Sequence, residues 1–158
     1  MNKSEQKVYF SAQALKSFVA AEQKVIKTVI CYLWHNAINK EEIVELIYGI
    51  EFAFADNSRL NLGSNNDNTG LEVIDFNFEA EKKNIENEYA GKIKLFAVNA
   101  SFTKMWEEVI GKKLNTIQLT KQNENYLSDS ILLNFGEERR IVSISPLDGL
   151  VIDFYEED

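Results

Sequence analysis

The chain has 158 residues, of which 45% are hydrophobic and 27% charged, and it contains one Pro and seven Gly. This length suits one compact domain, residues 1–158, and the composition excludes disordered, collagen-like and low-complexity chains. The formal net charge of −8 makes non-specific adhesion to nucleic acid or to an anionic membrane unfavourable, because phosphate groups would repel most of the surface, and we expect neither as a partner.

Residues 11–62 predict one helix followed by strands. Ser11 can cap a helix that ends near Lys24. β-Branched and aromatic residues then favour strands at about 25–33 and 43–55. A short Asp-Asn-Ser sequence follows and is typical of a turn, so 59–62 is expected to return as the second arm of a hairpin.

The middle of the chain begins with its most polar window, residues 63–70, which predicts an exposed, mobile loop. A strand is expected at 71–77. A helix follows at about 78–90, and Gly91 can end it in the left-handed conformation. Alternating apolar residues then predict a strand at 93–98.

The last third predicts a third helix, capped by Ser101 or Thr103 and ended by Gly111. Its apolar stripe has helical spacing: Phe102, Met105, Trp106, Val109 and Ile110. Four strands are then expected at 113–121, 129–135, 139–145 and 150–155.

The sequence Val-Ile-Asp-Phe occurs at 73–76 and again at 151–154, which indicates an internal duplication. Other core positions align in the same order along the two halves. Examples are Phe18 with Trp106, Ile26 with Leu114, and Ile50, Phe52 and Phe54 with Ile131, Leu133 and Phe135. The first repeat spans about 11–77, a bridging helix and strand span 78–98, and the second repeat spans about 99–156.

This pattern predicts an α+β fold with mostly antiparallel strands. Two pseudo-symmetric repeats, each a helix plus four strands, would form a sandwich or a partly open barrel with three peripheral helices. The reason is that a meander of strands with one apolar face gains stability by packing that face on a second apolar face. One continuous curved sheet with helices on one side is the alternative.

Asp75 and Asp153 occupy equivalent positions in the repeated sequence. Symmetry could bring the two carboxylates together as an acid/base or metal pair. Alternatively, each aspartate accepts hydrogen bonds from a neighbouring turn in its own repeat, and we favour this structural interpretation.

Cys31 is the only cysteine and His35 the only histidine. In a strand, residues four apart stand about 13 Å apart, so the two cannot form a nucleophile–base pair locally. We expect Cys31 in the core and no metal or cofactor, because no zinc, calcium or phosphate-loop pattern is present. A lone cysteine excludes an intrachain disulfide and favours a reducing, cytoplasmic location.

These observations favour a non-catalytic module that binds a protein, with an acidic surface that would attract a basic partner. A small acidic inhibitor of the immunity-protein kind is the more specific expectation, and it depends on size and charge alone. The expected contact surface contains an exposed aromatic residue, nearby acids and the polar loop. Its residues are Trp34, His35, Glu41, Glu42, Asn65, Asn66 and Asp67.

Two other functions stay open. A small-ligand protein or enzyme could have a pocket between the repeats, with Asp75, Asp153, Tyr32 and Arg59 as its polar groups. The chain could also be a subunit of a homo-oligomer whose edge strands pair between copies. The sequence does not determine the oligomeric state.

Overall fold

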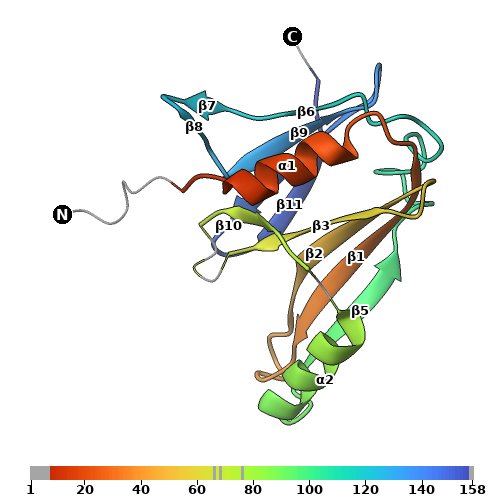
Figure 1. The fold of residues 1–158 in the computed structure, drawn as a ribbon. Coiled ribbons are helices and arrows are strands. Elements are labelled where there is room, and N and C mark those ends of the chain that lie inside the picture. Colours follow the sequence, from red (N-terminus) through yellow and green to blue (C-terminus); the bar gives the residue numbers. More distant parts are fainter. Residues whose placement is uncertain (1–7, 66, 68, 76, 157–158) are drawn as a thin grey trace.

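The computed structural model describes residues 8–65, 67, 69–75 and 77–156. It is an α+β fold in which mostly antiparallel strands form one sheet that curls into a half-barrel (Figure 1). The curled sheet corresponds to the expected partly open barrel rather than to a sandwich of two sheets. Neither helix in the described part of the chain is long and apolar enough to cross a membrane.

Two α-helices are present in the described residues, α1 (Ala12–Ala21) and α2 (Phe78–Glu88). The first part of the chain forms β1 (Ile26–Asn36), β2 (Val44–Phe54), β3 (Arg59–Ser64), β4 (Leu71–Val73) and β5 (Ile93–Asn99). The last part forms β6 (Thr116–Gln118), β7 (Lys121–Gln122), β8 (Asn125–Tyr126), β9 (Ser130–Asn134), β10 (Arg139–Ser145) and β11 (Gly149–Phe154).

Most predicted elements are confirmed, with shifted ends. Ser11 caps α1 by accepting a hydrogen bond from the Ala14 amide at 3.1 Å. The helix ends at Ala21 rather than near Lys24, because Glu22 is already extended and Gln23 then adopts a left-handed φ of 73°. Strand β4 is shorter than expected, and the short hairpin of β7 and β8 was not predicted.

The sheet consists of two antiparallel meanders joined by a narrow contact. Strands β1 to β4 pair in chain order, and β5 adds to the free side of β1. Strands β6, β9, β10 and β11 pair in the same manner. The two meanders meet where Gly149 and Leu150 of β11 pair in parallel with Ile47 of β2. The junction therefore depends on a few residues.

Strand β1 lies between two cores, and this explains its nearly continuous apolar sequence. Val29 and Cys31 belong to the main core inside the half-barrel, which also contains Phe18 of α1. The alternate residues of β1, including Tyr32, belong to a smaller core with Ile85 of α2. Because side chains alternate along a strand, α1 and α2 pack on opposite faces of the sheet. The single curved sheet of the alternative interpretation is therefore present, but its helices lie on both faces and not on one side.

The predicted third helix is also wrong, since residues 101–111 form a series of turns. Both ends of this segment are bound to β1: the Ala100 amide donates to the Val29 carbonyl, and the Gly111 amide donates to the Ile26 carbonyl. Those carbonyls are separated by about 10 Å at the rise of a strand. A helix from 100 to 111 would span about 16 Å, so a straight helix cannot reach both anchors.

The turns nevertheless bury part of the predicted apolar stripe. Trp106 and Val109 are 1% and 0% exposed, whereas Phe102 is 82% exposed.

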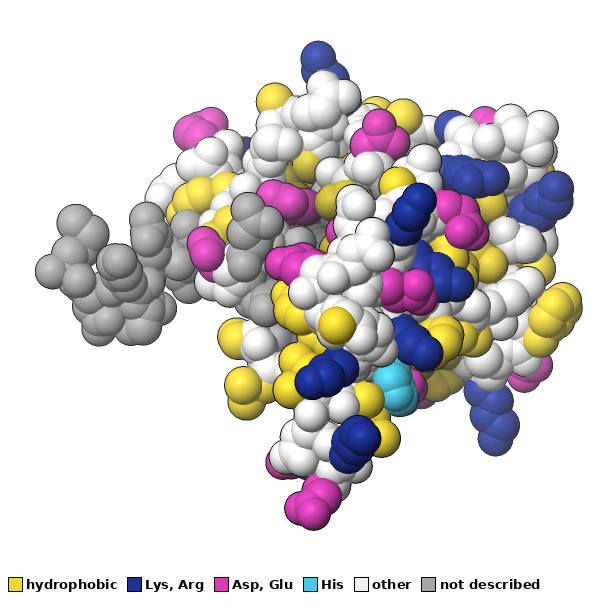
Figure 2. All heavy atoms as spheres, turned by 90° about the horizontal axis from the view of Figure 1, so that it is seen from below, with side chains coloured by type: hydrophobic (Ala, Val, Ile, Leu, Met, Phe, Trp, Pro, Cys, Tyr) yellow, Lys and Arg dark blue, Asp and Glu magenta, His cyan; other side chains and the backbone are white. Residues whose placement is uncertain are grey.

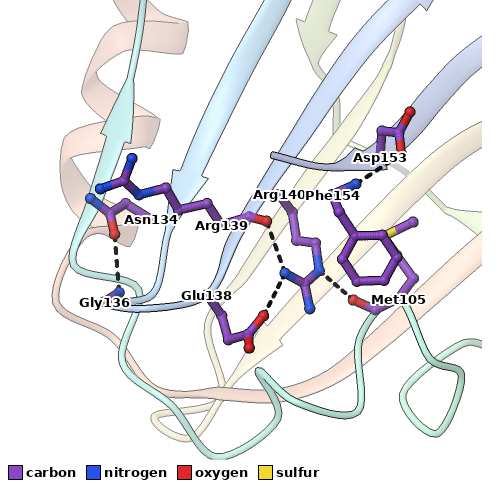
Figure 3. A network of polar contacts seen from close by, with 8 residues as sticks. All are labelled: Met105, Asn134, Gly136, Glu138, Arg139, Arg140, Asp153 and Phe154. Atoms are coloured by element: carbon purple, nitrogen blue, oxygen red, sulfur yellow. Dashed lines mark hydrogen bonds and ion pairs between the residues drawn. The ribbon is translucent and has the colours of Figure 1, made fainter. Parts of the chain in front are cut away.

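Figure 3 shows how Arg140 of β10 supports the segment of residues 101–111, with its Nε donating a hydrogen bond to the Met105 carbonyl at 2.6 Å. Its Nη1 donates to Glu138 Oε2 at 2.9 Å, and the ring of Phe154 lies 4.4 Å from its Cζ. The buried arginine thus satisfies the Met105 carbonyl, which in an α-helix would accept from the amide four residues later.

Candidate functional site

A cleft of about 520 Å³ lies where α2 meets the sheet, beside the junction of the two meanders. We call it the α2 cleft. It is lined by residues of β1, β2, the end of β3, α2 and the turn between β10 and β11: Trp34, Leu46, Ile47, Tyr48, Ser64, Asn65, Glu81, Ile85, Glu88, Tyr89, Pro146 and Gly149.

Three aromatic rings form one side of the α2 cleft. The rings of Trp34 and Tyr48 stack with centroids 5.7 Å apart and planes at 20°. Tyr89, which follows α2, meets Trp34 edge to face at 5.8 Å. All three side chains are half-buried. Aromatic rings packed on one another in this way form a rigid apolar surface with polar tips.

Two carboxylates come from α2. Glu81, Ile85, Glu88 and Tyr89 follow the i, i+4, i+7, i+8 spacing of one helical stripe, which places them on the side facing the cleft. The Tyr48 hydroxyl donates a hydrogen bond to Glu81 Oε1 at 3.3 Å. Burial, and next the negative charge of Glu81, raise the pKa of Tyr48 to about 12. Tyr48 therefore stays a neutral donor at physiological pH.

The α2 cleft carries negative charge without a cation of its own. None of the described residues that line it is Lys, Arg or His. In the described part of the chain, no cation forms an ion pair with Glu81 or Glu88. On the face of the molecule seen in Figure 2, acidic and basic side chains are interspersed. The net charge of the chain is therefore not gathered into one broad acidic field on that face.

The structure brings together only part of the predicted contact surface. Trp34 and Asn65 line the α2 cleft. Asn65 also closes its own loop, since its Oδ1 accepts a hydrogen bond from the Thr69 amide at 2.9 Å. Glu41 and Glu42 are exposed in the connection between β1 and β2 and do not line the cleft. Asp67 is exposed in a turn, and the prediction for Asn66 lies outside the described residues.

His35 faces away from the α2 cleft, because successive side chains of β1 point to opposite faces of the sheet. Its Nδ1 lies 3.0 Å from Glu45 Oε2, and its ring meets Phe96 of β5 at 5.7 Å. It therefore belongs to a different surface from Trp34.

The four polar residues proposed for a pocket between the repeats do not converge. Asp75 and Arg59 line a second hollow, of about 620 Å³, beside α1. Arg59 pairs with Glu51 at 3.4 Å. Burial, followed by the charge of Glu51, raises the pKa of Tyr32 to about 12. Asp153 lies on β11 and does not line this hollow, so it does not meet Asp75 there.

Cys31 is 8% exposed within the main core. Desolvation by burial raises the pKa of its thiol to about 11. A thiol that stays protonated at neutral pH is a poor nucleophile. Within the described residues, no group of three or more His, Cys, Asp and Glu side chains is placed to hold a metal ion.

The predicted sites did not include the two carboxylates of the α2 cleft or two of its three aromatic rings, which belong to Glu81, Glu88, Tyr48 and Tyr89. The helical spacing of Glu81, Ile85, Glu88 and Tyr89 was a usable signal, since it places two acids among the apolar residues of an inner stripe. The sequence around Tyr48 did not indicate that it belongs to this site, because its position beside Trp34 depends on the pairing register of β1 and β2.

No known protein family, no curated protein and no solved structure matches this chain.

Proposed function

We propose that this chain is a non-catalytic binding module and that its α2 cleft receives a basic region of a protein partner. The observation that carries the proposal is the composition of the cleft, which joins three aromatic rings to two carboxylates and contains no cation among its described residues. Aromatic side chains supply binding area at low entropic cost. Carboxylates of one sign attract an oppositely charged partner and exclude acidic ones.

The more specific proposal is a small acidic inhibitor of a basic protein, of the kind formed by immunity proteins, acting in the cytoplasm. Its support is the chain length of 158 residues and the net charge of −8. The free, buried Cys31 fits a reducing compartment.

The test is capture of partners from lysate of the source cell by the tagged protein, at low and at high salt. The cleft variant carries Glu81→Gln and Glu88→Gln. The matched control carries Glu107→Gln and Glu108→Gln, which remove the same charge from exposed positions outside the cleft. We expect a basic protein to be captured by the wild type and the control, released by high salt, and lost with the cleft variant.

Capture that survives in the cleft variant would place the contact elsewhere on the surface. Absence of any stoichiometric basic protein at low salt would remove the proposal altogether. Thermal melting of all three proteins shows whether each variant is folded before its binding is compared.

A small ligand is the second candidate for the same cleft. The volume of about 520 Å³ lies within the range of ligand pockets, and the cleft adjoins the junction between the two meanders, where Gly149 meets Ile47. Native mass spectrometry of protein purified from its source cell tests this candidate. A bound mass that the wild type retains and the Trp34→Ala variant lacks would favour it over a protein partner.

We also propose that the chain is one domain that arose by tandem duplication. The repeated Val-Ile-Asp-Phe sequence and the antiparallel pairing of β1 to β4 and of β6, β9, β10 and β11 support this origin. Superposition of β1–β3 on β6, β9 and β10 in an experimental structure tests it. Aligned core positions should coincide in space.

A further inference from the structure

The α2 cleft has the chemical features of a site for an organic cation. Cations are attracted to the faces of Trp and Tyr rings, most strongly where water is partly excluded. Trp34, Tyr48 and Tyr89 supply such rings, and all three are half-buried. The cleft thus offers an apolar, electron-rich surface beside negative charge.

The two carboxylates of the cleft are uncompensated within the described residues. Glu81 accepts a hydrogen bond from the neutral Tyr48 hydroxyl at 3.3 Å. Neither Glu81 nor Glu88 forms an ion pair with a cation in the described residues. Of the two lysines of α2, Lys82 lies over the ring of Phe78, at 5.8 Å from its centroid, and Lys83 forms no ion pair with either carboxylate among the described residues. A positive group from outside would therefore meet unneutralised charge.

The spacing of the carboxylates indicates the size of the occupant. Glu81 and Glu88 are seven residues apart on α2, which corresponds to about 10 Å along the helix axis. One compact ammonium ion cannot contact both carboxylates. Two long basic side chains from one short segment can do so, because alternate residues of an extended segment point to the same side about 7 Å apart.

Arginine fits these features better than lysine. A guanidinium is planar, stacks on aromatic rings, gives up its hydration more readily than an ammonium and pairs with a carboxylate through two parallel hydrogen bonds. We propose that the α2 cleft binds an arginine-rich segment of the partner, with guanidinium groups against Trp34 and Tyr89 and paired with Glu81 and Glu88. This inference rests on the proposed function, whose partner chemistry it specifies.

The test uses the peptide acetyl-Arg-Ala-Arg-amide as the probe. Its control replaces both arginines by citrulline, which keeps the shape and removes the charge. The chain contains two Trp residues, so two indole N–H signals are expected in a ¹H–¹⁵N correlation spectrum. Trp34 lines the cleft, whereas Trp106 is 1% exposed in the main core and serves as an internal reference.

We expect the arginine peptide to shift the Trp34 signal saturably and to leave the Trp106 signal in place. The citrulline peptide should bind at least about tenfold more weakly, since it loses the charge-dependent contacts. The Glu81→Gln, Glu88→Gln variant should lose affinity for the arginine peptide by a similar factor. The Glu107→Gln, Glu108→Gln control should bind it as the wild type does.

Equal binding of both peptides, or no saturable shift of Trp34, would overturn the inference. If the partner protein were still captured through Glu81 and Glu88 in that case, the proposed function would stand and only arginine recognition would fail. If capture were also unaffected by the loss of these two carboxylates, the proposed function of the α2 cleft and the recognition of arginine would both fail.

Discussion

The buried guanidinium of Arg140 donates from Nε to the main-chain carbonyl oxygen of Met105 at 2.6 Å, and this bond joins β10 to the turns of residues 101–111. Arg140 is 1% exposed. Replacing it by Met should lower the free energy of unfolding by about 2–3 kcal/mol, because the Met105 carbonyl and Glu138 lose a buried charged donor. Urea denaturation measures the change.

The matched control for this prediction is Lys104→Met, an exposed position in the same turn segment. Its effect should stay within about 0.5 kcal/mol, as expected for a surface substitution. An Arg140→Met protein as stable as this control would mean that Arg140 does not support the segment.

Gly149 fixes the junction between the two meanders. Its φ is 73°, and a Cβ at this position would lie 2.6 Å from the Ile47 carbonyl oxygen. Gly149→Ala should therefore cost about 2 kcal/mol or more, since it adds a backbone clash to the strain of the left-handed conformation. Gly111→Ala is the control, because Gly111 has a φ of 85° with open space around it. Chemical denaturation should show a loss of only about 1 kcal/mol for this control.

The contact between Tyr48 and Glu81 can be measured through the tyrosine. Burial and the Glu81 carboxylate raise the pKa of Tyr48 to about 12. Glu81→Gln should lower this pKa but leave it above the ordinary value of 10.0, because burial remains. Ultraviolet titration of the phenol absorbance, with Tyr48→Phe to assign the signal, measures the shift. An unchanged titration in Glu81→Gln would show that the carboxylate does not act on Tyr48.

The burial of Cys31 predicts that the protein loses stability at alkaline pH. Burial raises the pKa of its thiol from 9.0 to about 11 in the folded chain. Between these values the unfolded thiol loses its proton while the folded thiol keeps it, so rising pH favours unfolding. The contribution is present below pH 9 and is lost as the pH rises to about 11, and it amounts to roughly 3 kcal/mol.

The check is the free energy of unfolding measured from pH 8 to 11 in the wild type and in Cys31→Ala. Tyr32 and Tyr48 also titrate late in the folded chain and add to the loss above pH 10 in both proteins. The difference between the pH profiles of the two proteins gives the contribution of the Cys31 thiol to the free energy of unfolding. Parallel pH profiles would contradict the assigned burial of Cys31.

Local sequence patterns predicted much of the fold. Ser11 capped the first helix as expected. Alternation around Ile50, Phe52 and Phe54 identified β2, and all three side chains are buried. These features depend on residues close in the chain, so composition and spacing suffice to predict them. The third helix failed because its ends are held by Val29 and Ile26, far away in sequence.

The candidate site was predicted only in part for the same reason. Trp34 and Asn65 were expected to contribute to binding and do line the α2 cleft. His35 follows Trp34 directly but faces the other side of β1, and Glu41 and Glu42 lie in a connection outside the cleft. Proximity along the chain was a poor guide to proximity in space.

The sequence by itself determined the α+β class, the antiparallel strands, the positions of α1 and α2 and the net negative charge, because these follow from spacing, capping and composition. Only the tertiary structure decided which residues meet. The register of β1 against β2 brings Trp34 beside Tyr48, and the packing of α2 adds Glu81 and Tyr89. Such contacts join residues up to 55 positions apart, as in the pair Trp34 and Tyr89, and they depend on how whole faces fit together.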